Sequence, residues 1–245
     1  MTFDATLLVD RSVATANVAL GGDGQGGAAG PAGGGGYYLT RFFTTDTATV
    51  RHGVIAGNQA GEGAGTPTGG GGGGLFLQGI AATLDHLTID GNRLGSANMQ
   101  GGALVALSGL AGSTVALRWS AVSNHTQPAG ASAVHAQTGN TVTYATGLWD
   151  GNFDDSNEGA GGAGTFVNSG TMTNGGSLLY TAPGTPNFDY HLQGGSPAID
   201  AATGSTALLD FEANPRSQPD VGADEFFNEL IFANGFESGN TSAWN

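Results

Sequence analysis

Two histidines and an arginine recur at one position of a sequence pattern, and they are the side chains best suited to acid–base chemistry. His52, His86 and Arg118 each lie six residues before an asparagine that ends a short β-type run. An imidazole can act as a general base near neutral pH, and a guanidinium can bind the carboxylate of an acidic sugar. The three are therefore candidate catalytic residues of a carbohydrate-active enzyme, either a polysaccharide lyase or a glycoside hydrolase.

His52, His86 and Arg118, here called the column because they share one position of the repeat, can also be interpreted as structural residues. Stacked strands lie about 5 Å apart, so protonation of both histidines would be disfavoured. Asp85 cannot readily orient His86, because neighbouring residues on a strand point to opposite faces. The chain has no lysine, and most side chains around the pattern are small. We therefore favour a structural role for the column, with catalysis as the alternative.

An acidic segment at residues 150–158 offers oxygen atoms that could hold a cation. Its alternating ligands suit calcium, which prefers carboxylate and amide oxygens. The spacing departs from an EF-hand loop, since Asp155 stands where the sharp turn needs glycine. Calcium is the one cofactor that the sequence suggests, and the alternative is a solvated turn with no cofactor. The candidate ligands are Asp150, Asn152, Asp154 and Glu158.

The elements that carry these residues repeat along the chain. An asparagine recurs at spacings of 41, 34, 32 and 28 residues, preceded by a β-type run and followed by glycines and a second short apolar run. Short strands repeated without a helical period predict a solenoid of stacked parallel strands. Asparagines at one corner of every coil can form a hydrogen-bonded ladder. The expected ladder residues are Asn17, Asn58, Asn92, Asn124 and Asn152.

Composition excludes several classes of protein. The chain has 245 residues, a net charge of −14 and no cysteine, and 46 of its residues are glycine. The negative field repels phosphate backbones, which argues against nucleic-acid binding. No apolar run is long enough to span a membrane, and no thiolate metal site or disulfide can form. Glycine that recurs between the strands indicates turns rather than disorder.

Three motifs resemble known families. Asn58-Gln59-Ala60 followed by Gly69 to Gly74 resembles the right-handed parallel β-helix repeats of bacterial surface proteins and of the pectate-lyase superfamily. The stretches 195–200 (GSPAID), 214–216 (NPR) and 220–225 (DVGADE) are similar to the choice-of-anchor Q module that follows such β-helices. The last residues, 236–245 (FESGNTSAWN), look like the tails of many gammaproteobacterial exported proteins.

The resemblance implies a fold and a location. We expect an all-β, right-handed parallel β-helix of about five to six coils over residues 1–184 and a choice-of-anchor Q-like module over 185–227. A C-terminal cap or a sorting tail read by export machinery would occupy 228–245. No signal peptide follows Met1, which suggests a fragment of a longer secreted or cell-surface protein.

The expected function is that of a non-enzymatic stalk or display region, adhesive or in contact with polysaccharide or cell-surface glycan. The alternative is the enzyme acting on acidic polysaccharide, and a third possibility is a calcium-stabilised adhesin.

Overall fold

The protein is an all-strand structure in the part of the chain that the computed structural model describes. That part comprises residues 5–20, 32–41, 46–61, 70–95, 99–109, 111–125, 133–152, 160–170, 172–174 and 176–227. No helix occurs within these ranges, so the expectation of an all-β fold is confirmed. Among the same residues there is accordingly no helix with the length and apolarity that a bilayer crossing requires.

Most strands belong to two large parallel sheets. The larger, here called the long sheet, contains β1 (Thr6–Asp10), β2 (Val13–Thr15), β6 (Thr47–Ala56), β10 (Ala81–Asp90), β13 (Thr114–Arg118), β14 (Ala121–Ser123), β16 (Thr141–Ala145), β17 (Gly147–Asp150), β19 (Thr165–Asn168) and β20 (Met172–Asn174). The second contains β5 (Tyr37–Thr40), β9 (Leu75–Gln78), β12 (Leu104–Leu107), β15 (Val134–Ala136) and β18 (Ala160–Gly161).

Smaller pairings complete the inventory. The short sheet consists of β3 (Val18–Leu20), β7 (Gln59–Gly61) and β11 (Arg93–Leu94), which are parallel. A further parallel pair joins β4 (Ala32–Gly33) to β8 (Gly70–Gly71). The hairpin of β21 (Tyr180–Ala182) and β22 (Asp189–Leu192) is antiparallel.

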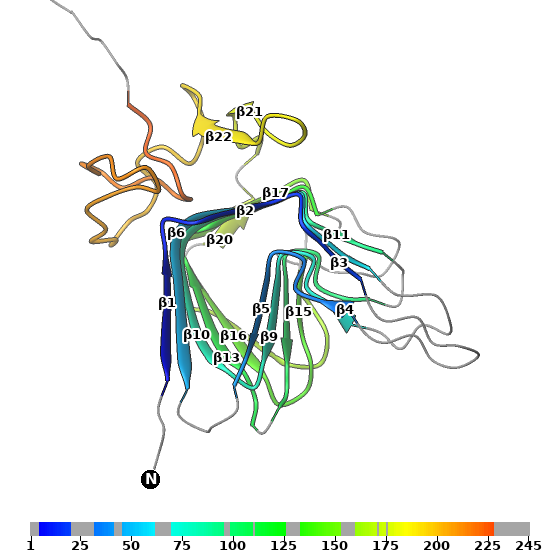
Figure 1. Ribbon diagram of the computed structural model, residues 1–245. Coiled ribbons are helices and arrows are strands. Elements are labelled where there is room, and N and C mark those ends of the chain that lie inside the picture. The colour runs from blue at the N-terminus through cyan, green and yellow to red at the C-terminus, as the bar shows by residue number, and fades with distance from the viewer. Residues whose placement is uncertain are drawn as a thin grey trace, which may run out of the picture.

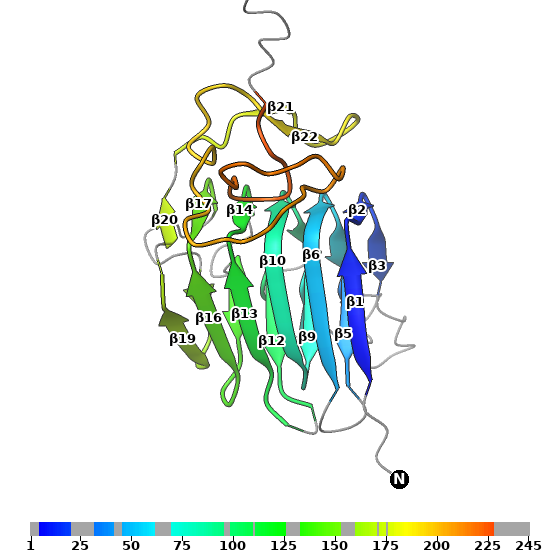
Figure 2. The same ribbon diagram turned by 90° about the vertical axis from the view of Figure 1, so that its left-hand side faces the viewer.

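The parallel strands stack in chain order. We number the repeats by their long-sheet strands: β1 and β2 in repeat 1, β6 in repeat 2, β10 in repeat 3, β13 and β14 in repeat 4, β16 and β17 in repeat 5, and β19 and β20 in repeat 6. Each strand pairs with its equivalents in the neighbouring repeats, so that the sheets run side by side along the stack (Figures 1 and 2). This arrangement is compatible with a parallel β-helix.

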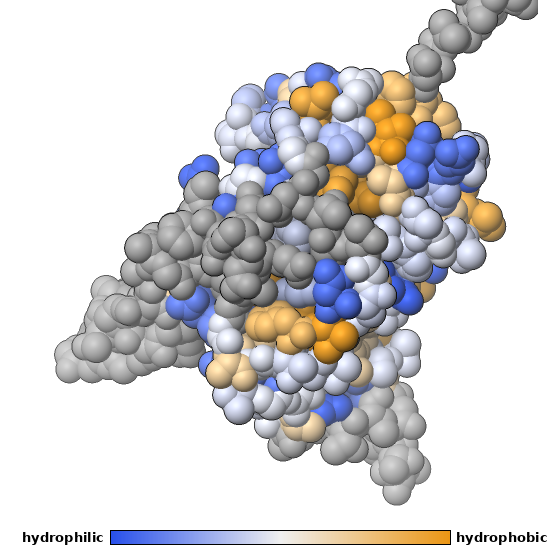
Figure 3. All heavy atoms as spheres, turned by 180° about the vertical axis from the view of Figure 1, so that it is seen from behind, coloured by the Kyte–Doolittle hydropathy of each residue, from blue (hydrophilic) through white to orange (hydrophobic). Residues whose placement is uncertain are grey.

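The core lies between the sheets. Alternate residues of a strand point inward, and in repeats 2 to 5 they include large apolar side chains. Ile55, Leu84, Leu104 and Trp149 are each fully buried in one continuous cluster. Apolar side chains are more exposed on β1, β2 and β3, which pair on one side only; there Leu20 is 69% exposed. On the face of the molecule opposite to that seen in Figure 1, hydrophobic residues form small groups among hydrophilic ones (Figure 3).

Glycine is required at one turn of three successive repeats. Gly34, Gly72 and Gly101 have φ angles of 65°, 68° and 71°, in the left-handed region. A Cβ atom at these positions would lie 2.1–2.2 Å from the carbonyl oxygen three residues later. Any other residue would therefore clash with its own turn, which explains part of the glycine content.

Residues 176–227, here called the closing segment, pack against the outer side of the long sheet. Leu178, Tyr190 and Val221 belong to a second apolar cluster that includes Val54 and Ala121 of the sheet. Figure 2 shows the segment crossing several strands of the sheet. The closing segment therefore lies along the flank of repeats 2 to 5. Tyr180 of β21 belongs to the same cluster.

The motif stretches of the closing segment meet one another. Val221 donates its N–H to the carbonyl of Ala198 at 2.9 Å, which joins the 195–200 and 220–225 stretches. The Arg216 side chain is fully buried and donates to the carbonyls of Leu209, Asp220, Gly222 and Ala223. It also pairs with Glu225 at 3.3 Å. These motif residues thus hold the segment together, and the tail at 228–245 lies outside the described residues.

Candidate functional site

The candidate column lies at the bend of the long sheet. His52 and His86 each have a φ of 51°, which bends β6 and β10 between their two halves. The equivalent residues in repeats 1 and 4 are Arg11, with φ 48°, and Trp119, with φ 49°. Arg118 was therefore assigned wrongly to this column, because the register places it one residue earlier, opposite Asp85.

Arg118 belongs instead to a neighbouring row of alternating charge. Asp10 is paired with Arg51, Arg51 with Asp85, and Asp85 with Arg118 in the strand register. Nε of Arg118 donates to Oδ1 of Asp85 at 2.7 Å, and Nη2 contacts Oδ2 at 2.5 Å. Nη2 of Arg51 lies 3.2 Å from Oδ2 of Asp10. Opposite charges on adjacent strands support the observed register.

The column and the charged row border one groove, here called the bend groove, of about 270 Å³. The rings of His52 and His86 have centroids 5.7 Å apart, and those of His86 and Trp119 are 5.4 Å apart. The Arg118 guanidinium carbon lies 4.9 Å from the Trp119 ring centroid. The closing segment supplies the opposite wall with residues 205–207. The structure thus brings His52, His86 and Arg118 together around one groove.

His86 is held by the closing segment at both ring nitrogens. Nδ1 lies 3.2 Å from the carbonyl oxygen of Asp220, and Nε2 lies 2.6 Å from the hydroxyl of Ser205. A carbonyl only accepts, so Nδ1 carries the proton and neutral Nε2 accepts from the hydroxyl. Burial, together with the positive charge of Arg216, lowers the pKa of His86 to about 3. Its imidazole is therefore neutral at pH 7.

The other two candidates are also engaged. Nδ1 of His52 lies 3.0 Å from Oδ1 of Asp10, and burial lowers the pKa of His52 despite this contact. Burial raises the pKa of Asp10, but its hydrogen bonds with His52 and Arg51 lower it overall. The hydrogen bonds from Arg118 to Asp85 raise the pKa of Arg118, which keeps that guanidinium charged.

This geometry is poorly suited to general acid–base catalysis. A catalytic base needs an accessible lone pair and a pKa near the working pH. His86 is 1% exposed and has both nitrogens bonded, and His52 is 8% exposed. Nε and Nη2 of Arg118 are both hydrogen-bonded to the carboxylate of Asp85. The bend groove can offer an indole face and guanidinium edges to a ligand, but its imidazoles connect parts of the fold.

The asparagine ladder runs along the next corner. The amide oxygen of Asn58 accepts from the N–H and the side-chain amide of Asn17, and Asn92 accepts in the same way from Asn58. The next rung is His125, whose N–H and Nδ1 lie 3.2 and 2.9 Å from Oδ1 of Asn152. The assignment of Asn124 was wrong by one residue: its side chain donates to Asp90 at 2.7 Å.

One side-chain oxygen of each of the two described calcium candidates already accepts from protein donors. Oδ2 of Asp150 accepts the N–H of Leu178 at 2.9 Å, and Oδ1 of Asn152 is used by the ladder. Asp154 and Glu158 lie outside the described residues. Within the described ranges no group of three histidine or acidic side chains could hold a metal. Calcium binding by this segment stays a prediction.

Several residues of the groove were not expected from the sequence. Ser205 and Asp220 reach His86 from more than a hundred residues away, so no local pattern could reveal them. The charged row of Asp10, Arg51, Asp85 and Arg118 did carry a signal. When His125 replaces Asn124 as the ladder residue of repeat 4, each of these four charged residues lies seven positions before a ladder residue.

Comparison of the chain with protein-family models, with curated proteins and with solved structures found no match.

Proposed function

We propose that this chain is a right-handed parallel β-helix of the pectate-lyase-like type that serves as a non-enzymatic stalk or display region of an exported bacterial surface protein. Support for the fold comes from the parallel strands, which stack in repeat order, and from the hydrogen-bonded corner residues. The motifs at 195–200 and 220–225 suggest a choice-of-anchor Q-like module, and the last ten residues suggest a tail read by export machinery.

The observation that carries the non-enzymatic role is the engagement of His86. The side chain best placed to be a base is buried, neutral and bonded at both nitrogens to the closing segment. Its evident contribution is to join that segment to the sheet. Each repeat of a solenoid contacts only its neighbours. A segment that is bonded to several repeats therefore adds connections that a stalk would otherwise lack.

A second candidate function is favoured by the bend groove itself. An indole, two guanidinium groups and two imidazoles line a groove of about 270 Å³, which could bind an acidic polysaccharide. In this alternative the chain is a polysaccharide lyase or glycoside hydrolase, with His52, His86 and Arg118 as its site.

Incubation of the full chain with pectate and alginate distinguishes the two functions. We expect no increase in ultraviolet absorbance from unsaturated chain ends and no release of reducing ends. The matched variant is His86→Gln, which can still donate to a carbonyl and accept from a hydroxyl. Turnover by the natural chain that this variant abolishes would overturn the proposal in favour of the enzyme.

A further inference from the structure

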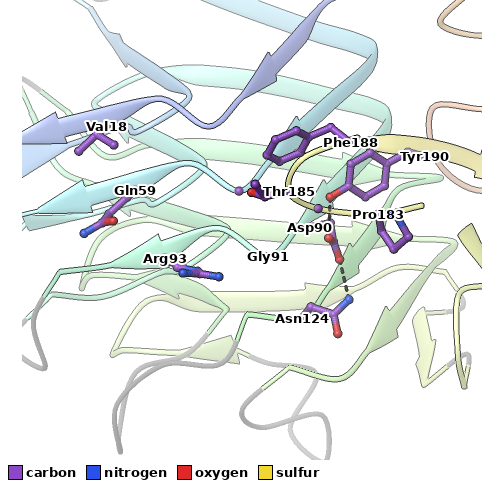
Figure 4. Close-up of a pocket in the computed structure, with 12 residues that line it drawn as sticks. Val18, Gln59, Asp90, Gly91, Arg93, Asn124, Pro183, Thr185, Phe188 and Tyr190 are labelled. Atoms are coloured by element: carbon purple, nitrogen blue, oxygen red, sulfur yellow. Dashed lines mark hydrogen bonds between the residues drawn. The ribbon is translucent and has the colours of Figure 1, made fainter. Parts of the chain in front are cut away.

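A second cavity, here called the hairpin cavity, lies between the short sheet and the loop of the β21–β22 hairpin, away from the bend groove. Its volume is about 360 Å³, which is within the range of small-molecule sites. Figure 4 shows Val18, Gln59 and Arg93 on one side and Thr185, Phe188 and Tyr190 on the other. Gln59 is paired with both Val18 and Arg93 in the strand register, so the three form a row across β3, β7 and β11.

Arg93 forms no ion pair with any carboxylate of the described residues. Arg11, Arg51, Arg118 and Arg216 each pair with a carboxylate. Within the described part of the chain, no carboxylate lies within salt-bridge distance of the Arg93 guanidinium. The chain has 20 acidic residues and only six arginines, so a guanidinium at a cavity without a carboxylate among the described residues is unusual here. Its five donors suit a planar carboxylate from outside the chain.

The nearby carboxylate does not neutralise Arg93. Asp90 is 5% exposed, and its oxygens accept from the hydroxyl of Ser123 at 2.6 Å, the amide of Asn124 at 2.7 Å and the hydroxyl of Tyr190 at 2.7 Å. Its carboxylate is thus already engaged by three donors within the protein. Asp90 holds one wall of the cavity in place, as the dashed lines of Figure 4 indicate.

The remaining lining suits a sugar ring. Gln59, Asn124 and Thr185 carry amide and hydroxyl groups that can exchange hydrogen bonds with sugar hydroxyls. The Phe188 ring lies so close to Gly57 that a Cβ atom there would be 2.7 Å from its Cε1 atom. Phe188 is only half-buried, which leaves part of an aromatic surface for the apolar side of a sugar.

We propose that the hairpin cavity binds a carboxylated sugar residue of a glycan, with the carboxylate on Arg93 and the ring near Phe188. This binding goes beyond the stalk role and needs no catalysis, so its failure would leave the proposed function unaffected. Attraction between one guanidinium and one carboxylate should weaken as salt is added.

The test is a titration of the full chain with trigalacturonate, followed by amide chemical shifts and calorimetry at low salt. We expect saturable shifts at Gln59, Gly91 and Arg93, and much weaker binding of galactotriose, which lacks carboxylates. Arg93→Gln should weaken trigalacturonate binding about 10- to 100-fold, the range expected for a charge-assisted contact. Arg11→Gln removes the same charge outside the cavity and should leave affinity unchanged.

A second variant fills the space without removing charge. Gly91 has a φ of 56°, and a Cβ atom there would meet nothing within 4 Å. Asn124 occupies the same corner of the next repeat with a φ of 58°, so Gly91→Asn should keep the backbone. It should also abolish binding with an unchanged melting temperature. Absence of binding, equal affinity for galactotriose, or full affinity in Arg93→Gln would each overturn the proposal.

Discussion

The hydroxyl of Tyr190 donates to the carboxylate of Asp90 across 2.7 Å, although the two residues are 100 positions apart. Asp90 ends a strand of repeat 3, and Tyr190 lies on β22 of the closing segment. Both are buried, and Tyr190 also packs edge-on against Tyr180 with ring centroids 5.1 Å apart. This contact and those of His86 attach the closing segment to the middle of the stack.

Loss of the Tyr190 hydroxyl should therefore destabilise the whole fold. Tyr190→Phe keeps the ring but leaves one oxygen of a buried carboxylate without its donor, at a cost of about 1–3 kcal/mol in the free energy of unfolding. Urea denaturation of the variant measures this. Tyr38→Phe is the matched control, because Tyr38 is exposed and should change stability by less than about 0.5 kcal/mol. Equal effects of the two substitutions would argue against the anchoring role of Tyr190.

The stability of the ladder should depend on His125 and not on Asn124. His125 is completely buried, and its replacement by alanine keeps the main-chain N–H but removes the Nδ1 donor to Oδ1 of Asn152. His125→Ala should lower the free energy of unfolding by about 2 kcal/mol or more, from lost hydrogen bonds and a cavity. His125→Asn restores the residue type of the other rungs and should recover a large part of this loss in urea titrations. No difference between the two variants would contradict the assignment.

The Asp85–Arg118 pair should contribute modestly and in a salt-dependent way. A double-mutant cycle with Asp85→Asn and Arg118→Gln should give a coupling energy of about 0.5–1 kcal/mol, as expected for a partly exposed ion pair. The same cycle repeated in about 1 M salt, where the screening length falls to about 3 Å, should give a smaller coupling energy. A coupling that does not fall with salt would point to packing against Trp119 instead.

His86 should make the fold sensitive to acid. Its pKa is about 3 in the folded chain, below its ordinary value of 6.5, so the unfolded state binds the proton first as pH falls. Its contribution is therefore fully present above pH 6.5 and is lost between there and pH 3, by up to about 1.4 kcal/mol per pH unit. His86→Gln should flatten this part of the stability profile. Comparison with the natural chain isolates His86 from Asp224, whose pKa burial raises to about 6 and which acts in the opposite direction.

The sequence was sufficient to predict the repeats but not all of their register. Counting from Asn124 aligned Ala116 and Ala121 with the large apolar residues of other repeats. Counting from His125 would have aligned Leu117 with Leu84 and Val122 with Ile89, as the strands are paired. A histidine can replace asparagine in the ladder because its N–H and Nδ1 both reach Oδ1 of Asn152.

Contacts with the closing segment were beyond sequence reasoning. Ser205, Asp220 and Tyr190 reach the sheet from 100 or more residues away, and their partners give no periodic signal. For the same reason the sequence did not reveal that this segment packs along the flank of the sheet. That no carboxylate of the described residues reaches Arg93 likewise depends on where those groups lie in space, which spacing along the chain does not reveal.

The most direct test of the account is the protonation state of His86 in the folded chain, measured by following its imidazole ¹⁵N shifts as a function of pH. We expect a neutral ring with the proton on Nδ1 from pH 8 down to at least about pH 4.5, well below the ordinary pKa of histidine. A ring that titrates near pH 6.5, or one that carries its proton on Nε2, would contradict the structural role assigned to His86.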